Sequence, residues 1–274
     1  MERSYGSTGW SITGNWKRSI DNDVRNGQFL RGDCLELMKD IPNGSVDMIL
    51  CDLPYGTTAC KWDTVIPFEP LWEQYWRVAK PNAAIVLTAS QPFTTNLIAS
   101  QIARFKYCWV WYKSKATGHI HAKNKPMKAH EDVCVFSRGT TIHANQSENR
   151  MTYNPQGLIR KPVPTIRKKG GSSDTVMSER KSHRDTLQEF GNYPHSVIEV
   201  QSEGGTVHPT QKPVALFEYL IKTYTNPGET VMDNCAGSGT TAIAAERAGR
   251  RWLCMEKDQA YYNAAIRRVA NEYY

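Results

Sequence analysis

The longest apolar runs of the chain lie in short segments that alternate with stretches of helical periodicity. The segments 46-VDMILC-51 and 83-AAIVLTA-89 are almost continuously apolar, as are strands that are buried on both faces of a parallel sheet. Between them, Leu71, Tyr75 and Val78 recur at helical spacing. This repeated order of helix and strand predicts an α/β domain with a parallel sheet.

The alternation continues along the chain, with one predicted hairpin. Two strands are expected within 106–138, joined by a long polar and basic loop at 114–130. A short strand is expected to end at Asp33, and 80-KPN-82 is expected to separate a helix from the strand that follows it. The other expected helices lie over 34–41, 92–103, 214–225, 240–249 and 259–274, and the other strands over 229–233 and 251–258.

Two regions depart from this pattern. Residues 1–25 are rich in Ser, Gly and Asn and are predicted to form an N-terminal arm. Residues 140–206 are polar, basic and interrupted by Pro and Gly, which is also typical of a solvated linker. The predicted division is therefore the arm, a first part of the main domain at 26–139, an insert at 140–206 and a second part at 207–274.

Composition narrows the class of partner. The 274 residues include 34 Lys and Arg against 27 Asp and Glu, so the net charge of +7 favours an anionic partner. The seven cysteines are scattered without a C-x-x-C pair, which argues against a disulfide framework or zinc ribbon, and no metal site is expected. Since no apolar run reaches the roughly 18 to 20 residues of a membrane span, we expect a soluble, intracellular protein without a membrane partner.

A glycine-rich turn follows the strand that ends at Asp233. Gly237 and Gly239 allow the backbone to approach a ligand closely, and the helix that begins at Thr240 offers unpaired N–H groups. Glu256 ends the next strand, 19 residues beyond Gly237, near the spacing at which a carboxylate meets ribose hydroxyls. The turn lacks the Lys of a P-loop and the third glycine of a dinucleotide site, so it predicts an adenosine ligand without phosphates.

A second motif, 52-DLPY-55, places a carboxylate and an aromatic ring just after a buried strand. Together with 233-DNCAGSGTT-241, it resembles the catalytic and cofactor motifs of the S-adenosylmethionine-dependent DNA amino-methyltransferases. The catalytic motif comes first in the chain, which is the circularly permuted order of the beta class of that family. The segment 208-HPTQKP-213, just before the cofactor motif, fits the same family.

The resemblance covers residues 28–138 and 207–274. It implies an α/β fold with a seven-stranded, mostly parallel, Rossmann-like methyltransferase sheet in circularly permuted order. The insert at 140–206 lies where the beta class carries its target recognition region.

The resemblance implies catalytic roles for the four residues of the DLPY motif. The exocyclic amine of adenine or cytosine is a poor nucleophile, because its lone pair is delocalised into the ring. The carboxylate of Asp52 and the backbone carbonyl of Leu53 are expected to accept its two hydrogens, while Tyr55 stacks on the flipped base. Pro54 is expected to fix the direction of carboxylate and ring, and Leu53 replaces a proline of the family, which loses a rigid φ.

The resemblance also implies S-adenosylmethionine as cofactor. Glu256 is expected at its ribose hydroxyls, Asp33 at its adenine amine, and Thr210 and Lys212 at its carboxylate. The complete predicted cofactor set is Asp33, Cys34, Asp52, Thr210, Lys212, Asp233, Cys235, Ala236, Gly237, Ser238, Gly239, Thr240 and Glu256. Asn234 and Cys235 stand where the family often has Pro and Phe.

Double-stranded DNA is the expected partner. Basic residues of the long loop and the insert are expected to contact its phosphates. The predicted DNA-binding residues are Lys113, Lys123, Lys125, Arg167, Lys168, Lys169, Arg180 and Lys181. The function expected from the resemblance is a site-specific DNA methyltransferase that methylates the N6 amine of adenine, because cytosine-N4 members more often have Ser in place of Asp52.

Three alternatives stay open at this point. They are a DNA cytosine-N4 methyltransferase, a catalytically inactive DNA-binding relative, which the Leu53 and Asn234 departures motivate, and a nicotinamide-dependent dehydrogenase, which the missing third glycine disfavours. A homodimer and a companion restriction endonuclease, as in restriction-modification, are compatible with the family. We expect a bacterial or phage-encoded protein in the cytoplasm, associated with the nucleoid.

Overall fold

The computed structural model describes residues 23–24, 26–58, 60, 63–141, 149–167, 186–202 and 211–273. The predicted N-terminal arm, except for residues 23 and 24, lies outside these ranges. The elements are, in chain order, β1 (Asp23–Val24), β2 (Gly27–Arg31), α1 (Cys34–Met38), β3 (Val46–Asp52), α2 (Phe68–Val78), β4 (Ala79–Ala89), α3 (Phe93–Ser100), β5 (Phe105–Thr117), η1 (His119–His121), β6 (Lys128–Phe136), β7 (Ile159–Arg167), β8 (Thr186–Gly191), β9 (Val197–Glu199), α4 (Val214–Tyr224), β10 (Thr230–Asp233), α5 (Thr240–Arg247), β11 (Arg251–Glu256) and α6 (Gln259–Tyr273).

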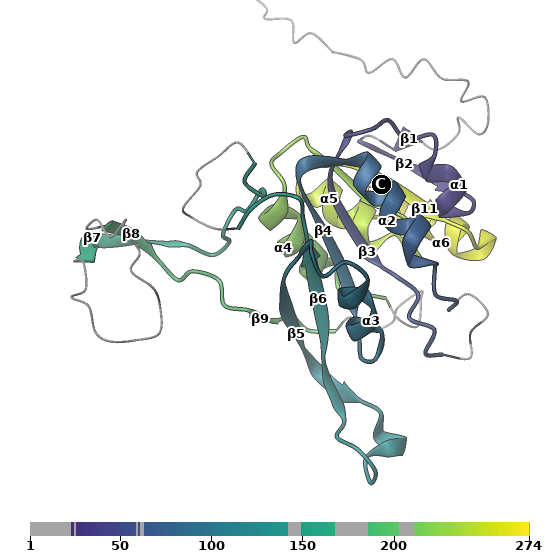
Figure 1. Ribbon diagram of the computed structural model, residues 1–274, viewed down its shortest axis with the longest axis horizontal. Helices are drawn as coiled ribbons and strands as arrows, with labels where there is room; N and C mark the ends of the chain where they lie inside the picture. Colours follow the sequence, from purple (N-terminus) through teal and green to yellow (C-terminus); the bar gives the residue numbers. More distant parts are fainter. Residues whose placement is uncertain are drawn as a thin grey trace, which may run out of the picture.

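The centre of the fold is one large sheet with the strand order β1-β2-β11-β10-β3-β4-β6-β5-β9 (Figure 1). Strands β2, β11, β10, β3 and β4 are parallel to one another, and β6 is antiparallel to both of its neighbours. The predicted mostly parallel α/β sheet with an antiparallel hairpin is therefore confirmed. The predicted seven strands correspond to β2, β11, β10, β3, β4, β6 and β5 in sheet order. The short strands β1 and β9 add one strand at each edge.

Helices cover both faces of the sheet, which explains the continuous apolar runs of its central strands. Met48 and Leu50 of β3 pack in the core cluster that includes α4, α5 and α6, whereas Ile49 and Cys51 pack in the cluster that includes α1, α2 and α3. All four side chains are fully buried. Alternate residues of one strand thus enter opposite cores, so no polar face remains.

Several element boundaries differ from the prediction. Strand β2 ends at Arg31, and Asp33 caps α1 instead, because its Oδ1 accepts the N–H of Leu35 at 3.0 Å. Strand β4 begins at Ala79, so the segment 80-KPN-82 lies within it, beside an irregularity in the register with β3. A bulge of this kind accommodates a proline inside a strand.

The hairpin of β5 and β6 is longer than predicted. Strand β5 continues to Thr117 and β6 begins at Lys128, so both strands extend into the expected loop at 114–130. The 3-10 turn at His119–His121 forms its tip, and Gly118 before it has a φ of 90°. Figure 1 shows that the hairpin extends well beyond the sheet.

The described part of the insert is structured. Strands β7 and β8 form a two-stranded antiparallel sheet that stands away from the main domain (Figure 1). Strand β9 then returns to the main sheet beside β5. A linker without secondary structure is therefore excluded for these residues.

None of the helices in the described ranges combines the length and hydropathy that a membrane span requires.

Candidate active site

Four predicted carboxylates lie at one edge of the sheet. Asp52, Asp233 and Glu256 are the last residues of the adjacent parallel strands β3, β10 and β11, and Asp33 follows β2 at the same edge. The carboxyl ends of parallel strands are where ligands bind in open α/β sheets. The structure thus brings the 52-DLPY-55 motif and the glycine-rich turn together, although they are far apart in the chain.

The carboxylate of Asp52 is held by three groups. Its Oδ1 accepts hydrogen bonds from the hydroxyl of Tyr55 at 2.8 Å and from the hydroxyl of Thr88, which lies opposite in β4. Its Oδ2 contacts the ammonium of Lys212 at 2.6 Å. Thr88 was not predicted, and only its register with Asp52 in the folded sheet reveals it.

Tyr55 turns its hydroxyl toward Asp52 and packs its ring on Phe93. The two ring centroids are 5.1 Å apart at an interplanar angle of 27°. Burial, and then the nearby Asp52 and Glu131 carboxylates, raise the pKa of Tyr55 well above its usual value, so this hydroxyl remains a hydrogen-bond donor. The stacking on Phe93 and the hydrogen bond of the hydroxyl together fix the ring of Tyr55 beside the Asp52 carboxylate.

The loop after Tyr55 is stiffened by contacts that the sequence did not reveal. The carboxylate of Asp63 accepts the backbone N–H groups of Gly56, Thr57 and Thr58 at 2.7 to 2.9 Å. Burial tends to raise the pKa of Asp63, but these hydrogen bonds outweigh it and lower the pKa. Leu53 also buries its side chain, with 4% exposure, so it contributes more than the backbone carbonyl that the motif suggested.

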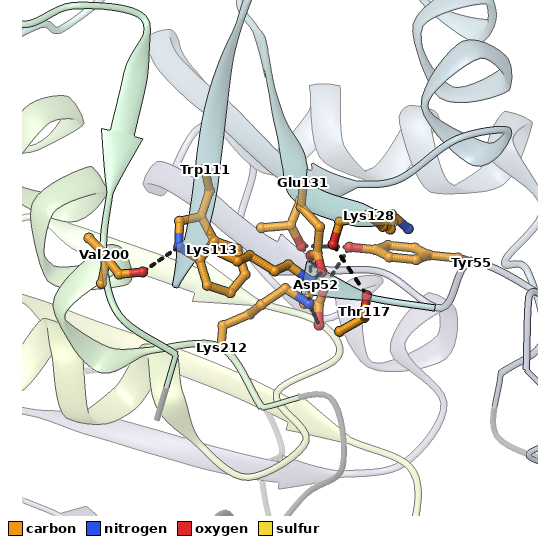
Figure 2. Close-up of polar contacts among 10 residues, drawn as sticks. Asp52, Tyr55, Trp111, Lys113, Thr117, Lys128, Glu131, Val200 and Lys212 are labelled. Carbon is orange, nitrogen blue, oxygen red and sulfur yellow. Dashed lines mark hydrogen bonds and ion pairs between the residues drawn. The ribbon is translucent and has the colours of Figure 1, made fainter. Parts of the chain in front are cut away.

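Lys212 is buried between the carboxylates of Asp52 and Glu131 (Figure 2). Besides Asp52, its ammonium contacts Glu131 Oε2 at 3.3 Å, and its backbone carbonyl accepts a hydrogen bond from Thr240, the first residue of α5, at 3.4 Å. Burial alone would lower the pKa of Lys212, but Asp52 and Glu131 outweigh it and raise the pKa. In this structure the ammonium therefore serves the catalytic motif, whereas the prediction placed it at the cofactor carboxylate.

Glu131 of β6 was not predicted as a site residue. It lies in the segment 130-HEDVCVF-136, where an acidic residue within an otherwise buried strand is the signal that sequence reasoning passed over. Its second oxygen is paired with Lys113. Lys113 was predicted to contact DNA, but its side chain is only 12% exposed and points into the site.

The glycine-rich turn is held by the carboxylates on either side of it. Asp233 is buried, and it accepts hydrogen bonds from the backbone N–H of Cys235 at 3.0 Å and from the hydroxyl of Thr241. Burial is the largest effect on Asp233 and raises its pKa to about 6. Glu256 Oε2 accepts the N–H of Gly237 at 2.8 Å, so this carboxylate lies against the turn.

The other residues of the turn pack inward. Cys235 lies beside Asn234, whose amide contacts the sulfur atoms of Cys34 at 3.5 Å and of Cys235 at 3.4 Å. The hydroxyl of Tyr75 donates to Asn234 Oδ1 at 2.5 Å, so the departure from the family's proline has a buried partner. The N–H of Ala236 donates to the Met255 carbonyl at 2.8 Å. The hydroxyls of Ser238 and Thr240 accept hydrogen bonds from Arg268. Gly239, between them, has a φ of 79°.

Asp33 forms an ion pair with Lys257 at 3.0 Å. The hydrogen bond from Lys257 is the largest effect on Asp33 and lowers its pKa. Both side chains are exposed, so Asp33 remains accessible at the edge of the site.

The predicted DNA-binding residues fall into separate regions. Lys123 and Lys125 are exposed beside the tip of the β5/β6 hairpin, and Arg167 ends β7. Lys168, Lys169, Arg180 and Lys181, together with the cofactor candidate Thr210, lie outside the described residues.

The residues present fit an adenosine cofactor. At Gly239, φ is in the region that favours glycine and an added Cβ would lie 3.2 Å from the Phe29 side chain, so core packing keeps a glycine in the turn. The turn leads into the first N–H groups of α5, and Glu256 is partly exposed at its edge. Within the described ranges, no group of three or more His, Cys, Asp or Glu side chains is placed to bind a metal ion.

Comparison with known proteins agrees with this arrangement. The chain is 23% identical over 259 residues to the type II methyltransferase M.HpaI of Haemophilus parainfluenzae, a match that spans 90% of this chain and 75% of the relative. The crystal structure of an M1.HpyAVI–SAM complex matches with a TM-score of 0.57 at 22% identity, over 88% of this chain and 99% of that one. The PvuII DNA methyltransferase, described as cytosine-N4-specific, matches with a TM-score of 0.61 at 16% identity, over 90% of each chain.

The family described as DNA methylase, with N6 and N4 members, matches residues 46–267. This match includes both the Asp52 turn and the glycine-rich turn, together with the insert between them. The chain therefore belongs to the DNA methylase family, the S-adenosylmethionine-dependent amino-methyltransferases of DNA.

Proposed function

We propose that the protein is a site-specific methyltransferase that methylates the N6 amine of adenine in double-stranded DNA after flipping the base. The observation that carries this proposal is the position of Lys212. Its ammonium lies on Asp52, and its carbonyl accepts from Thr240 at the start of α5. One residue thus contacts both the Asp52 turn and the start of α5, so the two segments lie close enough for transfer between ligands bound to them.

The residues of the chain divide into those that would hold the cofactor and those that would hold the base. S-adenosylmethionine, when bound, supplies a methyl group on a positively charged sulfur. Glu256 and the backbone of Gly237 to Gly239 would hold it, with Asp33 at the outer edge of the site. The turn from Asp52 to Tyr55 remains for the base.

Asp52 and Leu53 supply two acceptors for the amine hydrogens. When a carboxylate oxygen and a backbone carbonyl accept its two hydrogens, the amine nitrogen becomes pyramidal. Its lone pair is then no longer delocalised into the ring and can attack the methyl group. Lys212, Tyr55 and Thr88 fix the carboxylate beforehand, so little reorganisation is needed when the base arrives. The same intact set argues against an inactive DNA-binding relative.

Adenine is proposed because the motif begins with Asp52. The likeness to a cytosine-N4-specific enzyme keeps cytosine as the second candidate. Incubation of the purified protein with methyl-labelled cofactor and unmethylated DNA, followed by nucleoside analysis, is expected to give N6-methyladenine. Label found only in N4-methylcytosine would contradict the adenine assignment and leave the methyltransferase in place.

We infer that the β5/β6 hairpin and the insert face the DNA. No acidic residue occurs between Ser114 and His130, and Lys115, Lys123, Lys125 and Lys128 are exposed there. Strands β7 and β8 form a two-stranded ribbon, a shape that the major groove of DNA admits. Both features project from the main domain in Figure 1.

The double variant Lys123→Ala and Lys125→Ala is expected to weaken DNA binding. Loss of two phosphate contacts should reduce the slope of log affinity against log salt by about 2, because each contact releases close to one counterion. Fluorescence anisotropy with a labelled duplex at several salt concentrations measures this slope. Lys39→Ala, which removes another exposed charge just after α1, is the control, and an identical slope in both variants would contradict the assignment.

The proposal extends to the setting of the enzyme. The likeness to a type II methyltransferase favours a companion restriction endonuclease that cuts the same site. We also propose action on nucleoid DNA in the cytoplasm and a homodimer, which light scattering of the purified protein tests.

A further inference from the structure

Glu131 lies in the most enclosed part of the charged network at the site. Its side chain is 11% exposed, and the side chains of its two partners Lys113 and Lys212 are 12% and 5% exposed. Figure 2 shows the four charged side chains of Asp52, Glu131, Lys113 and Lys212 converging on one another. Charges so far from water are stable only when they are paired, and Glu131 pairs with Lys113 and is a second partner of Lys212 besides Asp52.

We propose that Glu131 is a positioning residue for methyl transfer, which shares the ammonium of Lys212 with Asp52 and fastens this pair, through Lys113, to the base of the β5/β6 hairpin. The inference rests on the proposed function, because it concerns the carboxylate that receives the amine.

Sharing the ammonium leaves Asp52 able to bind the base. Lys212 approaches Asp52 to 2.6 Å and Glu131 to 3.3 Å, so its charge is divided between two carboxylates. Without Glu131, the whole ammonium would bind Asp52, which has to accept a hydrogen of the amine. Glu131 thus weakens the contact of the Lys212 ammonium with Asp52, which competes with the amine of the base, and it also keeps the ammonium in place.

The same carboxylate connects the site to the hairpin. Glu131 lies opposite Trp111 in the pairing of β5 with β6, and Lys113, two residues further along β5, lies 5.2 Å from the Trp111 ring centroid. The Trp111 indole donates to the carbonyl of Val200 at 2.9 Å, just after β9. The hairpin and the end of the insert that returns to the main sheet are the proposed DNA-binding elements. Both are therefore connected to the charged network beside Asp52, through Glu131, Lys113 and Trp111.

The variant Glu131→Gln tests the proposal, with Glu73→Gln as the matched control. Glu73 is an exposed carboxylate of α2, outside the proposed DNA-binding elements, so its replacement removes the same charge and leaves both carboxylate partners of Lys212 in place. Glu131→Gln is expected to lower kcat by about a hundredfold, the effect of a misplaced reacting group. Its affinities for cofactor and DNA should stay at the wild-type values, and the control should keep wild-type kcat.

The pH profile separates this role from a merely structural one. Lys212 faces Asp52 from β3, Glu131 and Lys128 from β6, Lys113 from β5 and the ring of Tyr55. Loss of one carboxylate leaves burial less opposed and lowers the pKa of Lys212. The kcat of Glu131→Gln should therefore begin to fall at a lower alkaline pH than that of the wild type.

Two results would overturn the proposal. One is wild-type kcat in Glu131→Gln, and the other is a reduced kcat with an unchanged alkaline limb. Should Glu131→Gln not fold, as judged by cofactor binding in calorimetry, Glu131→Asp carries the test. It keeps the charge but shortens the reach, so kcat should fall while the alkaline limb stays, and an unchanged kcat would refute the role. A wild-type protein without methyl transfer would instead refute the proposed function.

Discussion

Replacing Asp52 with asparagine is expected to lower kcat for methyl transfer by two to three orders of magnitude, the usual cost of one preorganised polar contact, about 2.7 to 4 kcal/mol. Asparagine keeps the size of the side chain but removes the charge that pairs with Lys212. Its amide also turns a donor toward the amine or toward the hydroxyls of Tyr55 and Thr88, which need an acceptor. The predicted loss therefore combines a weaker acceptor with a disturbed carboxylate site.

Single-turnover methylation with saturating cofactor and DNA measures this effect without interference from product release. Cofactor binding to Asp52→Asn should persist in calorimetry, because Glu256 and the glycine-rich turn are unchanged. The exposed Glu73→Gln on α2 also serves here as the charge control. An Asp52→Asn enzyme with wild-type turnover would mean that Asp52 does not contact the reacting amine.

Replacing Lys212 with methionine is expected to lower the free energy of unfolding by about 3 to 5 kcal/mol, the cost of breaking a buried ion pair from one side. Methionine fills most of the space but leaves Asp52 and Glu131 without their shared cation. Among the described residues, Glu131 then keeps its ion pair with Lys113, and Asp52 keeps the neutral hydroxyl donors of Tyr55 and Thr88. Urea unfolding followed by circular dichroism measures the difference.

Lys222→Met is the matched control for this stability effect. Lys222 forms an ion pair with Glu218 one turn away on α4, and its side chain is 41% exposed. Exposed pairs of this kind contribute about 0.3 to 0.5 kcal/mol, so the control should stay close to the wild type. Equal losses in the two variants would contradict the view that Lys212 holds a buried charge network.

The pH dependence of stability has a defined sign. Burial tends to raise the pKa of Glu131, but Lys212 and Lys113 outweigh it and lower the pKa below its usual value. A carboxyl group with a lowered folded pKa stabilises the fold above its usual pKa and loses that contribution as the pH falls through the folded value. The difference between the wild type and Lys212→Met should therefore shrink in acid.

The sequence sufficed for the parts of the fold that depend on local pattern. The apolar run that ends at Asp52 predicts a buried strand, and the pattern before Gly237 and Gly239 predicts a short strand that leads into a turn. Both strands lie where expected. The order of the two motifs also predicts the permuted topology. In the structure β3 and β10, which precede the two motifs, are neighbours in the sheet.

The rest depends on pairing between distant segments, which periodicity does not specify. Thr88 becomes a site residue only through its register with Asp52, and Glu131 only because β6 lies beside β4. The loop stiffness that a proline at position 53 would give comes instead from Asp63, ten residues away in a polar stretch. The predicted hairpin is too short, because the ends of β5 and β6 near the tip are polar and lack the apolar pattern of core strands.

The central claim is that the Asp52 turn and the glycine-rich turn form one methyl-transfer centre for adenine in DNA. Sequencing that detects modified bases, applied to DNA from cells that express either the wild type or Asp52→Asn, tests it most directly. The account predicts N6-methyladenine at one recurring sequence with the wild type and a much smaller methylated fraction of the same sites with the variant. The same methylated fraction in both strains, or no modification in either, would contradict it.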